Sequence, residues 1–278
     1  LHVAAHAERL VAHGARVTLV TQQDFAFSDW LGGMLGGEWQ REDVRLPADR
    51  IVAHGGAHVR AEVIQVERQK RRITLGGGRQ LDYDWLSLDL PPVLDEHAIP
   101  GFYSAKGVFT AAADDLWQLR QQLETRLASA TGSLPAIAVI GGGPAGVELA
   151  ANLLALGERY GRRLPVTLIG NDRRPLPGAC QRANRWLMKR LLRRGLRLEL
   201  VATATRYDRH QLILDDGSAV DADLLLVTDH LQPSPAQALF DLTPDETGHL
   251  DVGPMLRSRE DSRLFLARET PPAHDRPL

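Results

Sequence analysis

The sequence predicts an α/β protein whose parallel sheets belong to two copies of one structural plan. Segments typical of strands and helices alternate along the chain, which favours parallel sheets. The two halves resemble each other, because residues 16–20 (RVTLV) match 165–169 (PVTLI) and residues 74–89 match 213–229. A glycine-rich run between an apolar strand and a helix in the second half is the third observation. Together these features predict two similar α/β domains.

Length and composition exclude several classes of protein. The chain has 278 residues, 44% hydrophobic and 24% charged, which excludes a collagenous or mostly disordered protein. A net charge of −2 gives no reason to expect nucleic acid as a partner. No apolar run approaches the roughly 20 residues that a transmembrane segment needs. The single cysteine, Cys180, excludes an internal disulfide and favours a reducing, cytoplasmic location.

The first half begins with a helix and a strand. Residues 2–13 are predicted as a helix that stops at Gly14, and residues 16–20 as a strand. The Gly- and Trp-rich segment 28–39 is expected to be a loop. Later strands are expected at 58–67, 71–75 and 82–90, and an amphipathic helix at 109–130.

The second half repeats this order of elements. Strands are expected at 136–140, 166–170, 196–201 and 221–229, helices at 144–160 and 181–194, and a hairpin at 204–220 with its turn at 215–217. The helix at 181–194 is strongly basic, but its apolar stripe is typical of an ordinary surface helix, so we interpret its charges as solvated.

The strongest chemical signal is the run VIGGGPAGVELA. Gly141, Gly143 and Gly146 form Gly-x-Gly-x-x-Gly between the predicted strand and helix. The first glycine permits a tight turn, the second lets the backbone approach a pyrophosphate, and the third lets the helix pack on the strand. The helix N-terminus offers N–H groups and the positive end of its dipole, and Pro144 fits its first turn. The run therefore predicts a dinucleotide-binding loop.

The residue that selects the ribose is expected at the end of the following strand. That strand ends at Ile169-Gly170, with no carboxylate on the strand itself, and Asn171, Asp172 and Arg173 follow. Asp172 would suit a ribose 2′-hydroxyl, whereas Arg173 and the adjacent arginine would suit a 2′-phosphate; solvated loop charges are the third interpretation. NADH and NADPH both stay open.

These residues carry a family resemblance. The run VIGGGPAGVELA resembles the NAD(P)H-binding loop of flavoprotein pyridine nucleotide oxidoreductases, which combine an FAD domain with an inserted NAD(P)H domain. The segments SDWLGGMLGGEW and LDYDWLSLD are similar to the branch associated with selenide, water dikinase, which is itself close to type II NADH dehydrogenases. The resemblance implies two Rossmann-like domains, with the NAD(P)H domain inserted in an FAD domain.

The resemblance also implies domain boundaries and site residues. We expect residues 1–108 and 231–278 to form the FAD-type domain, 109–133 a connecting helix, and 134–230 the NAD(P)H domain. In the family a glutamate after the third glycine lies near the nicotinamide–flavin contact, and Glu148 matches it here; a first-turn glutamate favoured by the helix dipole is the alternative. The candidate cofactor-binding residues are Gly141, Gly142, Gly143, Pro144, Ala145, Gly146, Glu148, Asn171, Asp172, Arg173 and Thr228.

Three departures from the family pattern concern FAD. The family's first Gly-rich loop belongs just before the 2–13 helix, so we expect an N-terminally truncated chain. Relatives usually have Thr-Gly where this chain has Thr228-Asp229. Their closing strand usually ends in Gly-Asp, whereas this one ends in Arg268-Glu269. FAD binding by this chain is therefore expected to be weakened.

Two functions follow from this reading. The first is an FAD-dependent oxidoreductase that passes hydride from NAD(P)H to flavin and on to a quinone-like or unknown small-molecule acceptor. The second is a degenerate, non-catalytic module that binds a nicotinamide nucleotide. The resemblance also raises a homodimer and a functional link to selenide, water dikinase. No cluster of His and Cys with metal-ligand spacing is present in the sequence, and no catalytic residue is named.

Overall fold

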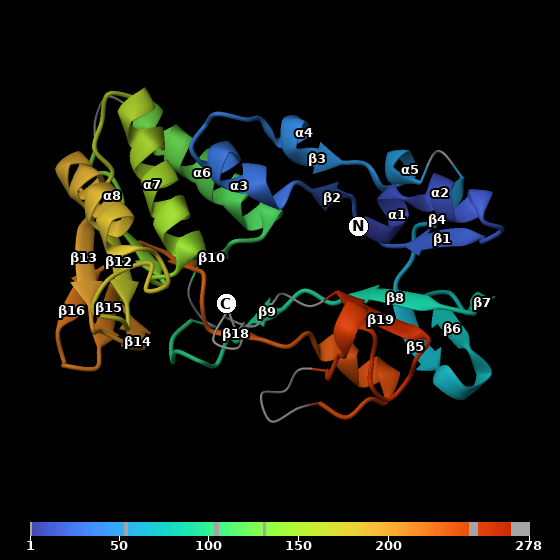
Figure 1. Cartoon of the computed structure of the whole chain (residues 1–278). Coiled ribbons are helices and arrows are strands. Elements are labelled where there is room, and N and C mark those ends of the chain that lie inside the picture. Colours follow the sequence, from blue (N-terminus) through green and yellow to red (C-terminus); the bar gives the residue numbers. More distant parts are fainter. Residues whose placement is uncertain (1, 53–54, 103–105, 130–131, 245–249, 268–278) are drawn as a thin grey trace. The chain divides into compact units, whose positions relative to one another are not determined.

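The chain forms two compact units. The computed structural model describes residues 2–52, 55–102, 106–129, 132–244 and 250–267 (Figure 1). Unit 1 comprises residues 1–25, 46–93 and 232–278, and unit 2 comprises residues 26–45 and 94–231. The chain passes between them at four short strands: β2 (Phe25–Ala26), β3 (Arg45–Leu46), β9 (Val93–Leu94) and β18 (Leu231–Gln232).

Unit 2 is built around a five-stranded parallel sheet of order β10-β17-β11-β12-β13. Its strands are β10 (Val108–Thr110), β11 (Ile137–Ile140), β12 (Val166–Gly170), β13 (Arg197–Leu200) and β17 (Leu224–Val227). Strand β11 lies at the centre, where Ile137 is opposite Val166 on one side and Leu224 on the other. All its residues are buried because both faces of the sheet are covered, which explains its uninterrupted apolar sequence.

Helices cover one face of this sheet, as Figure 1 shows. They are α3 (Ser28–Leu35), α4 (Arg41–Val44), α6 (Ala113–Ala128), α7 (Pro144–Arg159) and α8 (Gln181–Arg194). Val139 and Leu226 point into this helical layer, where they join Leu119 and Leu153 in one core cluster. Alternate residues of a strand face opposite sides of a sheet. Ala138 and Leu225 accordingly belong to the core on the other face.

A three-stranded antiparallel sheet covers the second face. It contains β14 (Ala204–Asp208), β15 (Gln211–Leu214) and β16 (Ala219–Asp221). Leu212 and Leu214 of β15 pack in the same cluster as Ala138 and Ile140 of β11. Unit 2 thus has three layers, and the carboxyl end of β11 is fixed from both sides.

Unit 1 contains smaller sheets. Its elements are α1 (His2–Ala5), α2 (Ala7–Ala12), β1 (Val17–Val20), α5 (Ala48–Ile51), β4 (Gly56–Val59), β5 (Val63–Glu67), η1 (Arg68–Lys70), β6 (Arg72–Leu75), β7 (Gln80–Asp82), β8 (Leu86–Asp89), η2 (Pro235–Phe240), η3 (Pro254–Leu256) and β19 (Leu264–Ala267). Strand β1 pairs in parallel with β4, and β19 in parallel with β8, as two separate two-stranded sheets. Strands β5, β6 and β7 form an antiparallel sheet. Val66, Leu75 and Leu266 share its core.

The predicted α/β class with parallel sheets is confirmed, while several local predictions were wrong. Residues 28–35 form helix α3 instead of a loop, because Gly32 and Gly36 bring its backbone against the side chain of Asn152 on α7. The helix expected at 109–130 begins at Ala113, because residues 108–110 pair with β17 as strand β10. The hairpin expected at 204–220 is a three-stranded sheet, since residues 219–221 also pair.

Two observations concern the expected domains and the membrane. Residues 26–45 and the described residues of 94–133 pack within unit 2, so α6, expected as a connecting helix, contributes Leu116 and Leu123 to that unit's core. The assignment of an FAD-type and an NAD(P)H-type domain stays a prediction. Of the helices described by the structure, none has the length and apolarity needed to cross a bilayer.

Candidate dinucleotide-binding site

The glycine-rich loop lies at the carboxyl end of the central strand. Strand β11 ends at Ile140, and α7 begins four residues later at Pro144. Gly141 has a φ of +123°, a value that residues with a side chain rarely adopt, and its N–H donates to the Ile169 carbonyl at 2.9 Å. This bond fixes the start of the loop to the neighbouring strand β12.

The three motif glycines have different surroundings. A β-carbon on Gly146 would collide with the carbonyl oxygen of Gly141, so the helix can approach the strand only because this side chain is missing. A β-carbon on Gly141 would collide with the Thr228 hydroxyl. A β-carbon on Gly143 would meet no atom of the described residues within 4 Å. Gly146 and Gly141 therefore serve packing, whereas Gly143 faces open space.

The start of α7 leaves donors for a ligand. Gly143 is the N-cap residue, and no side chain caps the helix there. Pro144 has no N–H, and the Val147 N–H is the first that bonds within the helix, to the Gly143 carbonyl at 3.1 Å. The N–H groups of Ala145 and Gly146 precede that bond. They lie at the positive end of the helix dipole, an arrangement that binds phosphate in other proteins.

The loop after β12 lies beside the glycine-rich loop. Gly142 and Gly170 approach each other closely, with only 3.4 Å between a β-carbon built on Gly142 and the α-carbon of Gly170. The Leu176 N–H donates to the Gly142 carbonyl at 2.8 Å and ties the two loops together. The structure thus brings the exposed residues Asn171, Asp172 and Arg173 to the same edge of the sheet as the motif.

Thr228 follows β17 and serves a structural role at this edge. Its N–H and its hydroxyl both donate to the Ile140 carbonyl, at 2.9 and 3.0 Å. This arrangement holds β17 against β11 where the loop begins. The hydroxyl group of Thr228 therefore donates its proton within the protein. The sequence placed Thr228 among the candidate cofactor-binding residues and contained no signal for this structural hydrogen bond.

Asp229 comes next, at the position where the family resemblance implies a glycine. Its Oδ1 is buried, and none of the described residues donates a hydrogen bond to it. Its carboxyl carbon lies 3.4 Å from the position that a β-carbon on Gly141 would take. Burial raises the pKa of Asp229, and the charge of His230 opposes that rise. The Arg268 and Glu269 departure lies outside the described residues.

Glu148 is an exposed residue in the second turn of α7, so the alternative interpretation as a first-turn glutamate was wrong, and its side chain points toward α3. A β-carbon on Gly32 would collide with Glu148 Oε1 and lie 2.8 Å from Asn152 Nδ2. The missing side chain at Gly32 therefore makes room for this carboxylate. Its proposed place near a nicotinamide–flavin contact stays a prediction of the resemblance.

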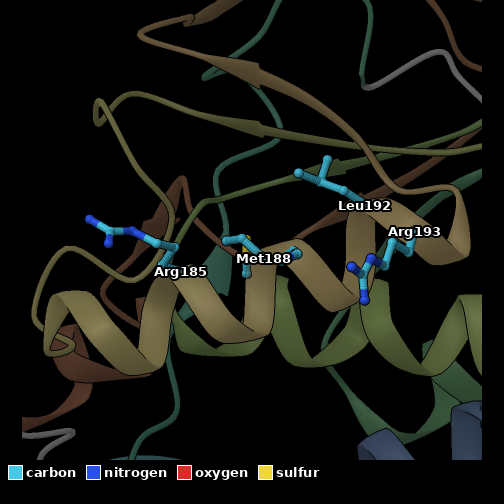
Figure 2. A pocket seen from close by; sticks show the side chains of 5 residues that line it. Arg185, Met188, Leu192 and Arg193 are labelled. Atoms are coloured by element: carbon cyan, nitrogen blue, oxygen red, sulfur yellow. The ribbon is translucent and has the colours of Figure 1, made fainter.

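A shallow pocket of about 460 Å³ lies along α8, away from the motif residues in the sequence (Figure 2). It is lined by Arg185, Met188, Lys189, Leu192 and Arg193, all from one face of this helix.

Cys180, the N-cap residue of α8, is exposed. Across the residues that the structure describes, no three His, Cys, Asp or Glu side chains are placed to hold a metal ion.

The residues present fit one dinucleotide. The open face of Gly143, the donors at the start of α7 and the exposed loop after β12 together suit a pyrophosphate flanked by a ribose. The described part of unit 1 has no second Gly-x-Gly-x-x-Gly turn between a strand and a helix.

Known proteins similar to this chain include one sequence family and two curated relatives. The sequence profile described as pyridine nucleotide-disulphide oxidoreductase matches residues 3–267. The chain is 25% identical over 258 residues to the demethylphylloquinone reductase NdbB of Synechocystis, covering 90% of this chain and 63% of that protein. It is 30% identical over 139 residues to the type II NADH:quinone oxidoreductase of Haemophilus influenzae, covering 46% of this chain and 31% of that protein.

Solved structures show the same fold. NDH2 from Plasmodium falciparum, in complex with NADH, matches with a TM-score of 0.77 at 17% identity, over 90% of this chain and 58% of that one. Reduced CoADR-RHD from Bacillus anthracis matches with a TM-score of 0.77 at 18% identity, over 95% of this chain and 48% of that one. The chain thus spans less than two thirds of the length of these relatives.

Proposed function

The chain belongs to the pyridine nucleotide-disulphide oxidoreductase family, and from this premise we propose that it is an NAD(P)H oxidoreductase of the flavoprotein type with a quinone as its acceptor. One observation carries the nucleotide part of the proposal. Gly143 presents a bare, open backbone at the N-terminus of α7 and at the end of the central strand β11. Both features favour a pyrophosphate at this point.

The residues of unit 2 bind and orient the nucleotide. The N–H groups of Ala145 and Gly146 hold the pyrophosphate, and the tie between Leu176 and Gly142 keeps the ribose-side loop in place. Thr228 fixes the opposite wall by bonding to the Ile140 carbonyl. Because these hydrogen bonds already hold the loops in place, the site loses little conformational entropy when it binds its ligand.

FAD is the second cofactor that family membership supports, and when bound it supplies the hydride acceptor and carries the electrons onward. The quinone acceptor is supported by the names of two relatives, a demethylphylloquinone reductase and an NADH:quinone oxidoreductase. The protein needs no acid or base of its own for hydride transfer, so we assign no catalytic residue.

The experiment that tests the proposal measures NADH and NADPH oxidation by the purified chain, supplied with FAD, with and without a water-soluble quinone. We expect quinone-dependent oxidation, together with flavin absorption that stays with the protein after desalting. The control variant Gly143→Val should lose the activity. Retained flavin without any oxidation of either nucleotide would contradict the proposal.

A second candidate function is a module that binds a nicotinamide nucleotide without turnover. It is favoured by the separate two-stranded sheets of the described part of unit 1, which contrast with the continuous sheet of unit 2. Nucleotide binding without retained flavin would support it over the first proposal.

Other expectations from the sequence stay predictions. Light scattering tests the predicted homodimer, and fractionation of the source cells tests the cytoplasmic location. Co-purification tests the functional link to selenide, water dikinase.

A further inference from the structure

Helix α8 presents a face of positive charge. Its 14 residues include six arginines and lysines and no Asp or Glu. Arg194 pairs with Glu158 at 2.7 Å. The other five cations are exposed, and none forms an ion pair with a carboxylate of the described residues: Arg182, Arg185, Lys189, Arg190 and Arg193. Because the whole chain has a net charge of only −2, this excess is local and would attract an anionic surface.

Apolar side chains lie among these cations. Trp186 is five residues before Leu191, which places it roughly 140° around the helix from that residue. Leu191 is 1% exposed and faces the core, whereas Trp186 is 64% exposed and Leu192 48% exposed. The Arg190 guanidinium lies 5.7 Å from the centre of the Trp186 ring. The buried stripe of an ordinary surface helix therefore accounts for Leu191 but not for the exposed Trp186 and Leu192.

The shallow pocket along α8 combines both kinds of side chain. Met188 and Leu192 supply its apolar part, and Arg185, Lys189 and Arg193 supply its positive charge (Figure 2). A lipid has the matching chemistry, because its anionic headgroup adjoins apolar chains. Arginine and lysine can lay their apolar stems along such a surface while the charged ends stay among the headgroups.

We propose that the exposed face of α8 binds the surface of an anionic lipid bilayer, with Trp186 and Leu192 entering the headgroup region and the five cations pairing with lipid phosphates. A helix of 14 residues is about 21 Å long, shorter than the hydrocarbon layer, so it lies in the plane of the interface. Tryptophan suits this depth because its ring is apolar and its N–H is polar.

The exposed apolar side chains favour a bilayer over a nucleic acid. The charge of a nucleic acid lies on its phosphates, which would engage the cations but leave Leu192 in water. The inference does not depend on the proposed function, since it uses no residue of the glycine-rich loop.

Vesicle co-sedimentation of the full chain tests the inference. The vesicles contain either phosphatidylcholine alone or an equal mixture of phosphatidylcholine and phosphatidylserine. We expect binding to the mixed vesicles, weaker binding as the salt concentration rises, and little binding to phosphatidylcholine alone.

Two pairs of substitutions locate the charge effect. Each Lys or Arg near an anionic bilayer strengthens binding about fivefold, so Lys189→Gln together with Arg193→Gln should weaken it about twentyfold to thirtyfold. The matched control is Arg206→Gln together with Arg209→Gln, which removes the same charge from exposed residues at β14, in the sheet that covers the other face of β11. This control should stay within about twofold of the unaltered chain, because salt screens charges farther away than the Debye length.

Two tryptophan variants locate the apolar effect at constant charge. Trp186→Gln should weaken binding to the mixed vesicles about threefold to tenfold, because the variant no longer buries the indole ring in the headgroup region. Trp85→Gln removes another exposed tryptophan, from unit 1, and should leave binding unchanged. Thermal unfolding checks that each variant folds, and NADH titration should give the same affinity for all of them.

Three results would overturn the inference. The first is failure of the unaltered chain to bind the mixed vesicles. The second is equal weakening by the α8 pair and the control pair, which would show a diffuse attraction and no site on α8. The third is binding to single-stranded DNA that the α8 pair abolishes while vesicle binding and Trp186→Gln show no effect, which would assign this face to nucleic acid. Loss of NADH binding by the unaltered chain would contradict only the proposed function.

Discussion

Two glycines of one loop are expected to respond in opposite ways to substitution. Gly143→Val places a side chain where the described structure has open space, and the backbone at Gly143 has φ −75° and ψ −175°, which any residue adopts. Gly146→Ala places a methyl group against the Gly141 carbonyl oxygen, which is backbone and cannot rotate away. The first change should therefore affect the ligand, and the second the fold.

The magnitudes follow from these surroundings. Gly143→Val should change the free energy of unfolding by no more than about 1 kcal/mol, the usual size of N-cap and glycine-replacement effects. Its side chain would displace a pyrophosphate held by charged hydrogen bonds worth about 1.5–3 kcal/mol each, which corresponds to a loss of roughly tenfold to a hundredfold in affinity. Gly146→Ala should cost about 1–3 kcal/mol of overpacking, or about 2–12 °C in Tm.

The assay combines NADH titration by calorimetry with thermal unfolding of both variants without ligand. We expect Gly143→Val to bind NADH weakly with a normal Tm, and Gly146→Ala to have a lowered Tm. Equal NADH affinity in Gly143→Val and the unaltered protein would refute the assignment of this loop to the pyrophosphate. A large fall in Tm for Gly143→Val would show that other protein atoms occupy the space beside Gly143 in solution.

Three further results are expected. Amide hydrogen exchange should be much slower across β11, which is paired on both sides, than across β1, which pairs with β4 alone; equal protection would contradict the pairing described. Glu158→Gln should lower stability by about 0.2–1 kcal/mol at neutral pH, since the half-exposed Glu158 pairs with Arg194 at 2.7 Å. The Arg194 hydrogen bond lowers the pKa of Glu158, so this contribution is present above its ordinary pKa of about 4.3 and is lost as pH falls through the lowered value; a pH-independent difference between variants in urea unfolding would refute it. Burial raises the pKa of Asp229, so ionisation of this carboxyl group lowers the stability of the folded state as the pH rises through the raised pKa. Asp229→Asn should therefore be more stable than the unaltered protein at pH 7, and this difference should vanish below about pH 4. A stability difference that persists below about pH 4 would contradict burial of the carboxylate as its cause.

The sequence predicted the parts of the fold whose signals are local. Strand β11 is apolar throughout because both its faces are buried, and α7 follows a motif that defines its start. Gly195 ends α8 in the left-handed conformation at φ +106°, as the stop signal indicated. The glycine-rich loop lies at the carboxyl end of β11, as its order of elements required.

Features that depend on distant neighbours could not be predicted in this way. Helix α3 contains Gly32 and Gly33, which are typical of loops when only nearby residues are considered. Contact with α7 explains the missing side chain at Gly32, and contact with the Trp39 ring explains it at Gly33. The hydrogen bond from the Thr228 hydroxyl to the Ile140 carbonyl depends on the register between β17 and β11. The same register determines why Asp229 Oδ1 accepts no hydrogen bond from the described residues. No single-residue pattern in the sequence carries that information.

The interleaved order of the two units has a consequence for synthesis on the ribosome. Unit 2 has all its segments once residue 231 is made, whereas strand β8 of unit 1 must wait for its partner β19 at Leu264–Ala267. At about 5–20 residues per second, that interval lasts about 2 to 7 s. During it, unit 2 is free to fold while the apolar residues of β8 have no parallel partner. Residues 46–93 are therefore the nascent segment that most needs protection from aggregation, and chaperone capture during translation should concentrate there.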